Sequence, residues 1–472
     1  MGQNVPSTCD TLIIGAGMSG LAAGIRLAQY DQDVVVLDRH ALWGGLNSFY
    51  KKAGRPFDVG LHALTNYVDK GTRGKPLTRI LRQLRIPYDA LELGQQWVSE
   101  SAFPGVKLRF SNDFQLLRNE VAEKFPQQID GFDRLSTYLA EYPDLPSGGI
   151  PVFARTRLAE YLTDERLVDL LLLPILYYGS PTPHDIEWGS FVVLWKSLYE
   201  EGFARPRGGV RTILKLLRDR FQELGGQLHM RQGVAKVLHE NGKAIGVRLD
   251  SGHEIRAKRI LSSAGLVETM ALCGGDVQDK FSEQKCAGEM TFVECISLLD
   301  KPLVDLGHDK TITFFNSAER LVYEAPEQAV DCRSGVICCP DHYDNQVPQH
   351  EPALRLTLRA HPQKWFEMDA DTYAAAKESA WQEGHEAILP FAPDIRGHTV
   401  FVDTFTPRTV RHFTGHTRGV VYGSPHKSPD GTTDLKNLFL MGTDQGFLGI
   451  VGAMLSGIAM ANVHALQASP SQ

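Results

Sequence analysis

Residues 10–39 read DTLIIGAGMSGLAAGIRLAQYDQDVVVLDR, and this stretch decides the fold. The apolar residues at 12–14 predict a strand, the glycines that follow predict a tight turn, and the amphipathic pattern after them predicts a helix that ends near Tyr30. A second apolar run at 34–37 predicts another strand, which ends at Asp38. The order strand, glycine turn, helix, strand is that of a βαβ unit with two parallel strands.

Each glycine of this turn has a physical function. Gly15 permits the turn, Gly17 lets the backbone approach a pyrophosphate, and Gly20 lets the helix pack on the sheet. The free N–H groups of the helix start face the phosphates, and an acid at the tip of the second strand can accept hydrogen bonds from a ribose diol. The unit therefore predicts a dinucleotide site formed by Gly15, Gly17, Met18, Ser19, Gly20 and Asp38.

Length and composition describe an ordinary globular protein with more than one core. A chain of 472 residues is too long for a single simple core, so two intertwined domains are expected. Apolar residues make up 43%, charged residues 22%, and the net charge is -7. Because Lys and Arg are scattered and outnumbered by acids, a nucleic-acid partner is not expected.

The cysteines and the lengths of the apolar runs indicate the cellular compartment of the protein. Seven cysteines show no CxxC or zinc spacing, which favours free thiols, a reducing cytoplasmic location and no metal site. No apolar run approaches 18 residues, so neither a signal peptide nor a membrane span is expected. The neighbouring Cys338 and Cys339 are open to two interpretations, a redox pair or a buried pair of small side chains.

The segment after Asp38 reads RHALWGGLNSFYKKAGRPFDVGLHAL and is punctuated by glycine. A nicotinamide dehydrogenase would normally continue into another helix and strand here. A chain that lies close along a bound cofactor explains such a loop, because Gly44 and Gly45 offer backbone N–H groups and room for approach. The alternative is an exposed glycine loop.

The residues described so far resemble those of a known protein superfamily. The first glycine turn, Asp38 with Arg39, the double glycine and FDVG at 57–60 resemble the FAD-binding region of the flavin amine oxidase and phytoene desaturase superfamily. The resemblance implies that the double glycine lies near the phosphates and that residues 58–63 approach the flavin. Leu46 stands where the superfamily usually has an arginine. The contacts implied in this region are those of Arg39, Gly44, Gly45, Leu46, Gly60, Leu61 and His62.

The rest of the chain fits a split domain with an insertion. Residues 67–204 carry helical patterns between proline turns and suggest a helical cap. Within it, residues 167–178 are apolar on nearly all sides, which indicates either a buried helix of the core or a wall of an apolar cavity. Residues 205–263 predict a helix at 210–224 and strands at 227–230, 234–240, 244–249 and 259–263, and resemble the second FAD-domain segment. By that resemblance the backbone of Val234 meets the adenine.

The C-terminal stretch NLFLMGTDQGFLGIVGAMLSGIAMAN has the same arrangement as the first motif. A predicted strand at 438–441 leads into a turn and a helix, whose N-terminus can bind a polar ligand. By resemblance Asp444 meets the ribityl or phosphate region, and the helix start lies near the flavin N1 and C2 carbonyl. This block, with TPRT at 406–409, is most similar to the carotenoid isomerase and retinol saturase branch. The implied contacts are Gly442, Asp444, Gly449, Ile450 and Val451.

We therefore expect an α/β protein with a split Rossmann-type FAD-binding domain and an inserted α+β substrate-binding domain with a helical cap. The expected FAD-binding domain comprises residues 1–66, 205–275 and 430–472, and the substrate-binding and cap domain comprises 67–204 and 276–429. The FAD is expected to be non-covalent, since no His or Cys stands in a flavin-linking motif. With one dinucleotide fingerprint, electrons are expected to pass to or from a diffusible acceptor or donor.

The resemblance implies a desaturase, saturase or redox-neutral isomerase that acts on carbon–carbon double bonds of a lipophilic isoprenoid or polyene. His62 is a weak catalytic candidate, and Arg411, His412 and Tyr422 are weaker. Two alternatives stay open: a flavin amine oxidase acting on a soluble amine, which would need a lysine near the flavin, and a non-catalytic flavin-binding protein. We also expect reversible, peripheral attachment to the inner face of a membrane through an apolar patch around residues 167–178 or 191–199.

Overall fold

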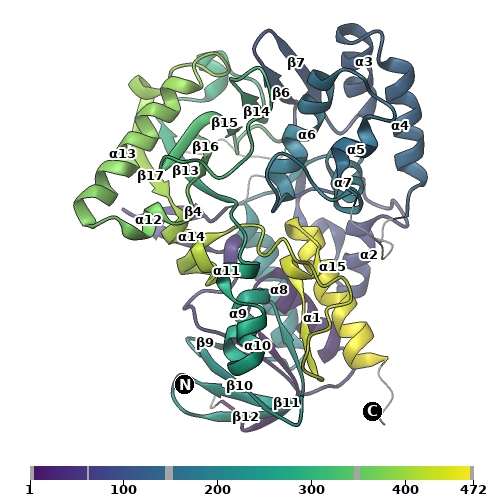
Figure 1. Ribbon diagram of the computed structural model, residues 1–472, viewed down its shortest axis with the longest axis vertical. Helices are drawn as coiled ribbons and strands as arrows, with labels where there is room; N and C mark the ends of the chain where they lie inside the picture. Colours follow the sequence, from purple (N-terminus) through teal and green to yellow (C-terminus); the bar gives the residue numbers. More distant parts are fainter. Residues whose placement is uncertain (1–4, 61–62, 144–151, 345–350, 468–472) are drawn as a thin grey trace.

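The computed structural model describes residues 5–60, 63–143, 152–344 and 351–467. Two seven-stranded sheets organise it, one in each half of the molecule. The lower half in Figure 1 holds both described ends of the chain, and the upper half holds the second sheet with α13 on one side and the cap helices on the other.

The first sheet contains the βαβ unit. β1 (Thr8–Ile14) pairs in parallel with β2 (Val34–Asp38) on one side and with β12 (Glu254–Ser262) on the other. β9 (Gln227–Met230) and β18 (Leu438–Leu440) add further parallel strands, and β10 (Val234–Glu240) and β11 (Lys243–Leu249) form an antiparallel edge. Strands from three distant segments thus build one Rossmann-type sheet, which confirms the expected fold class.

Three helices cover one face of this sheet and share a core. α1 (Met18–Ala28) packs between α8 (Val210–Glu223) and α15 (Gly449–Ala461), and Figure 1 shows α1 and α15 side by side. Gly457 permits the close approach, because a Cβ there would lie 2.1 Å from the Ser19 carbonyl oxygen. α2 (Pro76–Leu84), from the segment assigned to the cap, also buries its apolar side chains in this core. The remaining helices of this half are α9 (Leu266–Cys273), α10 (Gly275–Lys280) and α11 (Glu283–Cys286).

One helix of the described residues, spanning Gly449–Leu466, is long and apolar enough to cross a membrane, with a mean hydropathy of 1.5. The sequence pattern did not predict a run of this length. Half of it is buried inside the protein, where it packs against α1, so its apolar character is that of a core helix.

The second sheet has the order β17, β13, β16, β15, β14, β6, β7. Its strands are β17 (Thr399–Phe405), β13 (Thr291–Leu299), β16 (Ala353–Ala360), β15 (Val330–Cys338), β14 (Ile312–Asn316), β6 (Ser99–Phe103) and β7 (Val106–Phe110). The sequence patterns at 291–299, 311–316 and 354–359 predict three strands, which correspond to β13, β14 and β16, and the other four strands were missed. β6 and β7 come from the segment read as helical, and β6 joins β14 in parallel. The pattern at 371–388 predicts a helix, and the structure has α13 (Ala370–Ala387) there, packed on one face of this sheet.

The cap lies against the other face. Its helices are α3 (Phe114–Lys124), α4 (Ile129–Glu141), α5 (Ala154–Leu158), α6 (Glu165–Gly179) and α7 (Trp188–Trp195). Short elements lie between the two halves: β3 (Phe49–Lys52) with β4 (Arg55–Asp58), β5 (Leu93–Gln95) with β8 (Ala204–Pro206), and α14 (Pro407–Thr414). α12 (Lys364–Glu367) packs against α14 and the core of the second sheet.

α6 is the central helix of the cap core. Pro174 lies inside it and has no N–H, and the hydroxyl of Ser101 on β6 donates to the Leu170 carbonyl oxygen at 2.7 Å. Leu172 and, on α7, Trp195 are fully buried. The expectation that residues 167–178 or 191–199 form an exposed apolar patch is therefore wrong. These residues are apolar because they face the second sheet and the other cap helices.

Candidate functional site

The first glycine turn leaves open space at the start of α1. Gly15 has φ +102°, and a Cβ at Gly20 would lie 1.9 Å from the Gly15 carbonyl oxygen, so both positions require glycine. A Cβ at Gly17 would have no protein atom within 4 Å, and no side chain caps the helix. The free N–H groups around Met18 and Ser19 therefore border a space that suits an anionic group.

The double glycine borders the same space. Gly44 has φ +113° and donates its N–H to the Ala16 carbonyl oxygen at 2.9 Å. Gly45 has φ +56°, and a Cβ there would lie 4.0 Å from the Cα of Gly17. Two backbone segments without side chains thus face each other, which is the room that a pyrophosphate needs. An exposed glycine loop, the alternative interpretation, does not fit this packing.

The chain comes back to the double-glycine loop at Gly60. A Cβ at Gly60, which has φ +74°, would lie 2.7 Å from the Leu46 carbonyl oxygen. The predicted contacts Leu46 and Gly60 are therefore neighbours. Leu61 and His62, the other predicted contacts of this segment, lie outside the described residues, and so does the weak catalytic assignment to His62.

Asp38, Arg39 and Val234 come together at one end of the sheet. The Asp38 carboxylate accepts hydrogen bonds from the Ala16 N–H at 2.9 Å and the His40 N–H at 2.8 Å. Gly233, next to Val234, packs against the Arg39 side chain. Each carboxylate oxygen has two lone pairs, so Asp38 can hold the turn and still accept a ribose hydroxyl.

The C-terminal motif closes on the first turn. A Cβ at Gly442 would lie 3.1 Å from the Ser19 Oγ, and the Gly442 N–H donates to Ser456 Oγ at 2.6 Å. Ile450 and Val451, in the first turn of α15, are buried, and a Cβ at Gly449 would lie 3.7 Å from Thr65 Oγ1. The start of α15 thus lies beside the chain segment that follows residues 61–62.

Asp444 is buried, and protein donors surround its carboxylate. Oδ2 accepts the Leu266 N–H at 2.6 Å, and Oδ1 accepts the Ser424 N–H at 2.9 Å and the Lys427 Nζ at 3.1 Å. Burial lowers the pKa of Lys427, and the Asp444 carboxylate opposes that shift. Asp444 therefore joins three chain segments through its side chain, and its carbonyl oxygen accepts the Ser428 N–H at 2.8 Å. The sequence carried no signal for Lys427.

Asp58 forms a second buried junction that sequence reasoning missed. Its Oδ1 accepts from the Arg211 Nε at 3.0 Å and Nη2 at 2.6 Å, and its Oδ2 lies 3.4 Å from Arg205 Nη2. Its carbonyl oxygen accepts from Arg355 Nη2 at 3.1 Å, and Arg355 pairs with Glu294 at 2.6 Å. Charges on β13 and β16 are the signal that could have indicated it, since strands buried on both faces rarely carry unpaired charges.

The weaker candidates lie in two places. His412 Nε2 lies 3.0 Å from His40 Nε2, and Arg411 accepts the Arg39 Nη2 on its carbonyl oxygen at 3.5 Å, so both lie beside the Asp38 end. Tyr422 is buried in the cap core, where its hydroxyl donates to the Tyr177 carbonyl oxygen. The structure therefore does not bring these candidates together.

Cys338 and Cys339 are both buried, and burial raises the pKa of Cys338 to about 12 and that of Cys339 well above its usual value. Such thiols stay protonated and are poor nucleophiles. The interpretation as a packed pair is the one that fits.

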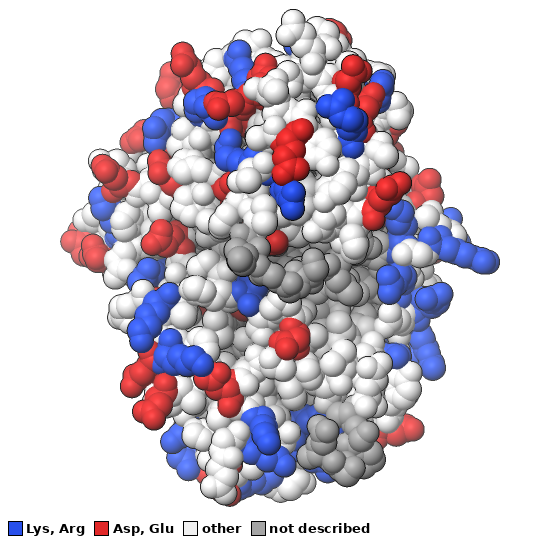
Figure 2. Space-filling view, turned by 45° about the vertical axis from the view of Figure 1, so that its right-hand side comes forward, with Lys and Arg blue, Asp and Glu red and all other residues white. Residues whose placement is uncertain are grey.

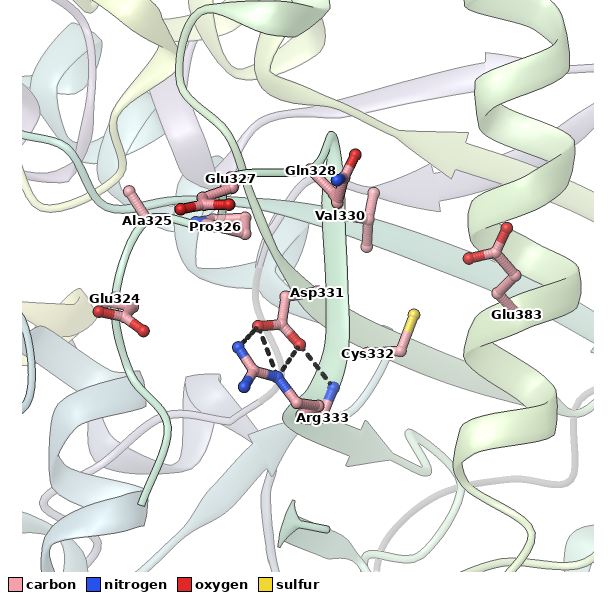
Figure 3. A pocket seen from close by; sticks show the side chains of 10 residues that line it. All are labelled: Glu324, Ala325, Pro326, Glu327, Gln328, Val330, Asp331, Cys332, Arg333 and Glu383. Atoms are coloured by element: carbon pink, nitrogen blue, oxygen red, sulfur yellow. Dashed lines mark hydrogen bonds and ion pairs between the residues drawn. The ribbon is translucent and has the colours of Figure 1, made fainter. Parts of the chain in front are cut away.

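A hollow of about 680 Å³ lies between α13 and residues 324–333, which lead into and begin the central strand β15. Figure 3 shows the side chains that line it. Its lining is polar, and Asp331 in it is paired with Arg333 at 2.6 Å and with Arg359 at 2.9 Å. It lies on a different part of the chain from the glycine turns. On the face shown in Figure 2, acidic and basic side chains are mixed over most of the surface, and basic side chains gather along its right-hand edge.

The glycine turns, the acid at the strand tip and the two helix starts together form a site for a dinucleotide, and the similarities that follow make the chain an FAD-dependent oxidoreductase. The model of the NAD(P)-binding Rossmann-like domain matches residues 13–84. All-trans-retinol 13,14-reductase of Danio rerio is 26% identical, covering 98% of this chain and 87% of the relative. Prolycopene isomerase of Arabidopsis thaliana is 22% identical, covering 97% and 82%. The crystal structure of an oxidoreductase from Methanosarcina mazei has a TM-score of 0.68 at 17% identity, covering 95% and 99%. These similarities fit the resemblance to the phytoene desaturase, carotenoid isomerase and retinol saturase-like proteins that the motifs carry.

Proposed function

We propose that this protein acts on a carbon–carbon double bond of a lipophilic polyene such as a carotenoid or retinoid, as a desaturase, saturase or redox-neutral isomerase. The named relatives act on such molecules, and they align with nearly all of the chain. When bound, FAD supplies hydride or single-electron chemistry at its N5 atom. The chain binds and orients the cofactor through the residues described above.

The observation that carries the proposal is the contact between the cap and the start of α15. A Cβ at Gly179, the last residue of α6, would lie 2.5 Å from Leu448 Cδ1, and Leu448 caps α15. On the cap side of this contact the side chains are aromatic and aliphatic. The predicted flavin region is therefore next to an apolar wall, which suits a hydrocarbon chain and excludes water from it.

We propose that electrons reach or leave the flavin through a diffusible partner, because the sequence carries one dinucleotide fingerprint. No disulfide joins any of the seven cysteines, all of which lie among the described residues, and this supports a location in a reducing cytoplasm. Reversible attachment to the inner membrane face remains part of the proposal, since a polyene is nearly insoluble in water. Phe153, 40% exposed at the start of α5, is an aromatic side chain of the described cap residues that can enter a bilayer.

The test is anaerobic incubation of oxidised and of reduced holoprotein with carotenoids, retinoids, squalene-type lipids and, as a separate arm, soluble amines. Chromatography should show a polyene that gains or loses two hydrogens or changes its double-bond geometry. Oxidation of an amine with no change in any polyene would replace the proposal with the amine oxidase alternative. A protein that binds FAD and changes nothing in the panel would favour a non-catalytic function.

Membrane attachment is tested by flotation with neutral phosphatidylcholine vesicles. The wild type should float with these vesicles. It should stay bound in high salt, because a chain with a net charge of -7 is not attracted to anionic lipid and its attachment does not depend on charge. Phe153→Ser should shift protein to the aqueous fraction. Complete recovery of the wild type in the aqueous fraction would remove the membrane from the proposal and leave the reaction unaffected.

A further inference from the structure

Tyr178 lies where the cap meets the start of α15. Its ring stacks on Phe203, with centroids 5.2 Å apart and planes inclined by 18°, and it is tilted against Phe314 at 5.9 Å. The next residue is Gly179, whose contact with Leu448 was described above. Tyr178 is thus one residue from the boundary between the apolar wall and the predicted flavin region, and its ring is held by two aromatic neighbours.

The hydroxyl of Tyr178 is buried and has no hydrogen-bond partner among the residues that the structure describes. Neighbouring buried tyrosines differ from it in this respect. The Tyr177 hydroxyl pairs with Ser334 Oγ at 3.0 Å, that of Tyr199 donates to the Leu171 carbonyl oxygen at 2.9 Å, and that of Tyr323 donates to the Ser180 carbonyl oxygen at 2.8 Å. Buried hydroxyls are normally paired because an unpaired one is destabilising, so Tyr178 requires an explanation.

The titratable groups that act on this hydroxyl are neutral. Burial raises the pKa of Tyr178 well above its usual value, and the titratable groups that act on it are Cys338 and Tyr422, whose own pKa values burial raises to about 12 and beyond. All three groups therefore stay neutral. A neutral phenol can donate one hydrogen bond and accept others, which suits a neutral oxygen in a ligand better than an ammonium or a carboxylate.

We propose that Tyr178 determines specificity by hydrogen bonding to an oxygen substituent of the substrate, so that the preferred substrate is an oxygenated polyene, an alcohol or a carbonyl compound, and not a hydrocarbon. The inference rests on the proposed function, which supplies the polyene. A hydrocarbon would leave the hydroxyl unpaired, whereas an alcohol or carbonyl group would satisfy it. Sites built around a buried hydrogen bond discriminate strongly against analogues that lack the partner group.

The test compares all-trans-retinol with its deoxy hydrocarbon, in which hydrogen replaces the hydroxyl, by equilibrium binding to wild-type holoprotein and to Tyr178→Phe. The wild type should bind retinol at least about tenfold more tightly than the deoxy compound, and Tyr178→Phe should bind the two about equally. The melting temperature of Tyr178→Phe should equal or exceed that of the wild type, because the variant loses an unpaired hydroxyl. FAD content should not change.

Tyr199→Phe is the matched control, because it removes a buried hydroxyl that is already paired. It should lower the melting temperature and leave the preference for retinol intact. If the ratio of the two affinities is the same in the wild type and in Tyr178→Phe, the inference is overturned while the proposed function stands. If the wild type binds neither compound nor any other polyene, the proposed function fails and the inference fails with it.

Discussion

A Cβ atom built on Gly45 would lie 4.0 Å from the Cα of Gly17, so two glycine turns separated by α1 and β2 face each other across the start of α1. The gap between them is bordered by backbone on both sides. Some of these glycines leave room for the cofactor, and others are needed for the packing of the protein itself. Substitutions at single glycines can therefore distinguish the two functions.

Gly17→Val should nearly abolish FAD binding and leave the apoprotein folded. No protein atom lies within 4 Å of the new Cβ, and Gly17 has the extended conformation φ -77°, ψ -174° that valine adopts readily. The valine side chain would occupy the space of the pyrophosphate. The ratio of flavin to protein absorbance after gel filtration measures the effect, with the apoprotein melting temperature beside it.

Gly20→Ala is the contrasting variant. Its Cβ would lie 1.9 Å from the Gly15 carbonyl oxygen, so the apoprotein itself should be destabilised. Equal flavin content in wild type and Gly17→Val would contradict the assignment of the turn.

Asp38→Ala should weaken FAD binding by about 1.5–3 kcal/mol, the range for a hydrogen bond to a charged group. Part of the loss reflects the turn, because the carboxylate also holds the N–H groups of Ala16 and His40. Asp38→Asn keeps one acceptor oxygen and should lie between the wild type and Asp38→Ala. Titration calorimetry of the apoproteins with FAD measures the series, and an unchanged dissociation constant in Asp38→Ala would rule out the ribose contact.

Asp444→Ala should destabilise the holoprotein by about 3–5 kcal/mol, as expected when one partner of a buried ion pair is removed. The Lys427 ammonium and the N–H groups of Leu266 and Ser424 would lose their acceptor. The double variant Asp444→Ala with Lys427→Met should lose less than the sum of the single variants. Denaturant unfolding of all four proteins gives the coupling energy, and strict additivity would show that the pair contributes nothing.

Stability should fall between pH 6.5 and pH 4 because of His308. Burial lowers the pKa of His308 to about 4, and its Nε2 has no partner among the described residues. A depressed histidine pKa means that the unfolded chain takes up the proton first, so the stabilisation is complete above the unfolded value and is lost as pH falls through the folded value. A shift from 6.5 to about 4 corresponds to about 3 kcal/mol. His308→Leu should flatten the pH dependence of the unfolding free energy by about this amount, and an identical slope in the variant would exclude His308 as its source.

Leu172→Ser should destabilise the protein by about 3 kcal/mol or more, because it leaves a cavity and an unpaired hydroxyl in the cap core. Leu172 is fully buried, whereas Phe153 is 40% exposed, and Phe153→Ser should change the unfolding free energy by less than about 1 kcal/mol. Comparable losses in the two variants would contradict the burial of α6.

Local patterns were enough for much of the fold. The βαβ unit, the strands β9, β10 and β13 and the helix α13 follow from periodicity and turn residues, which are properties of short stretches. β6 and β7 were missed because they are two short strands in a mainly helical segment, and strands of that length carry weak periodic signals. Residues 167–178 are apolar on all sides, and periodicity does not distinguish a buried helix from an exposed apolar surface.

The sequence by itself determined that this chain has a dinucleotide-binding unit, because the steric freedom of Gly15, Gly17 and Gly20 and the position of Asp38 are local to thirty residues. Only the tertiary structure decided which distant groups meet: Gly45 with Gly17, Lys427 with Asp444, and Asp58 with the arginines of two other segments. It alone left the Tyr178 hydroxyl without a partner. The physical reason is that ion pairs and buried hydroxyls depend on how separate strands and helices dock. That docking is set by sheet register and core packing over the whole chain, and no short stretch encodes it.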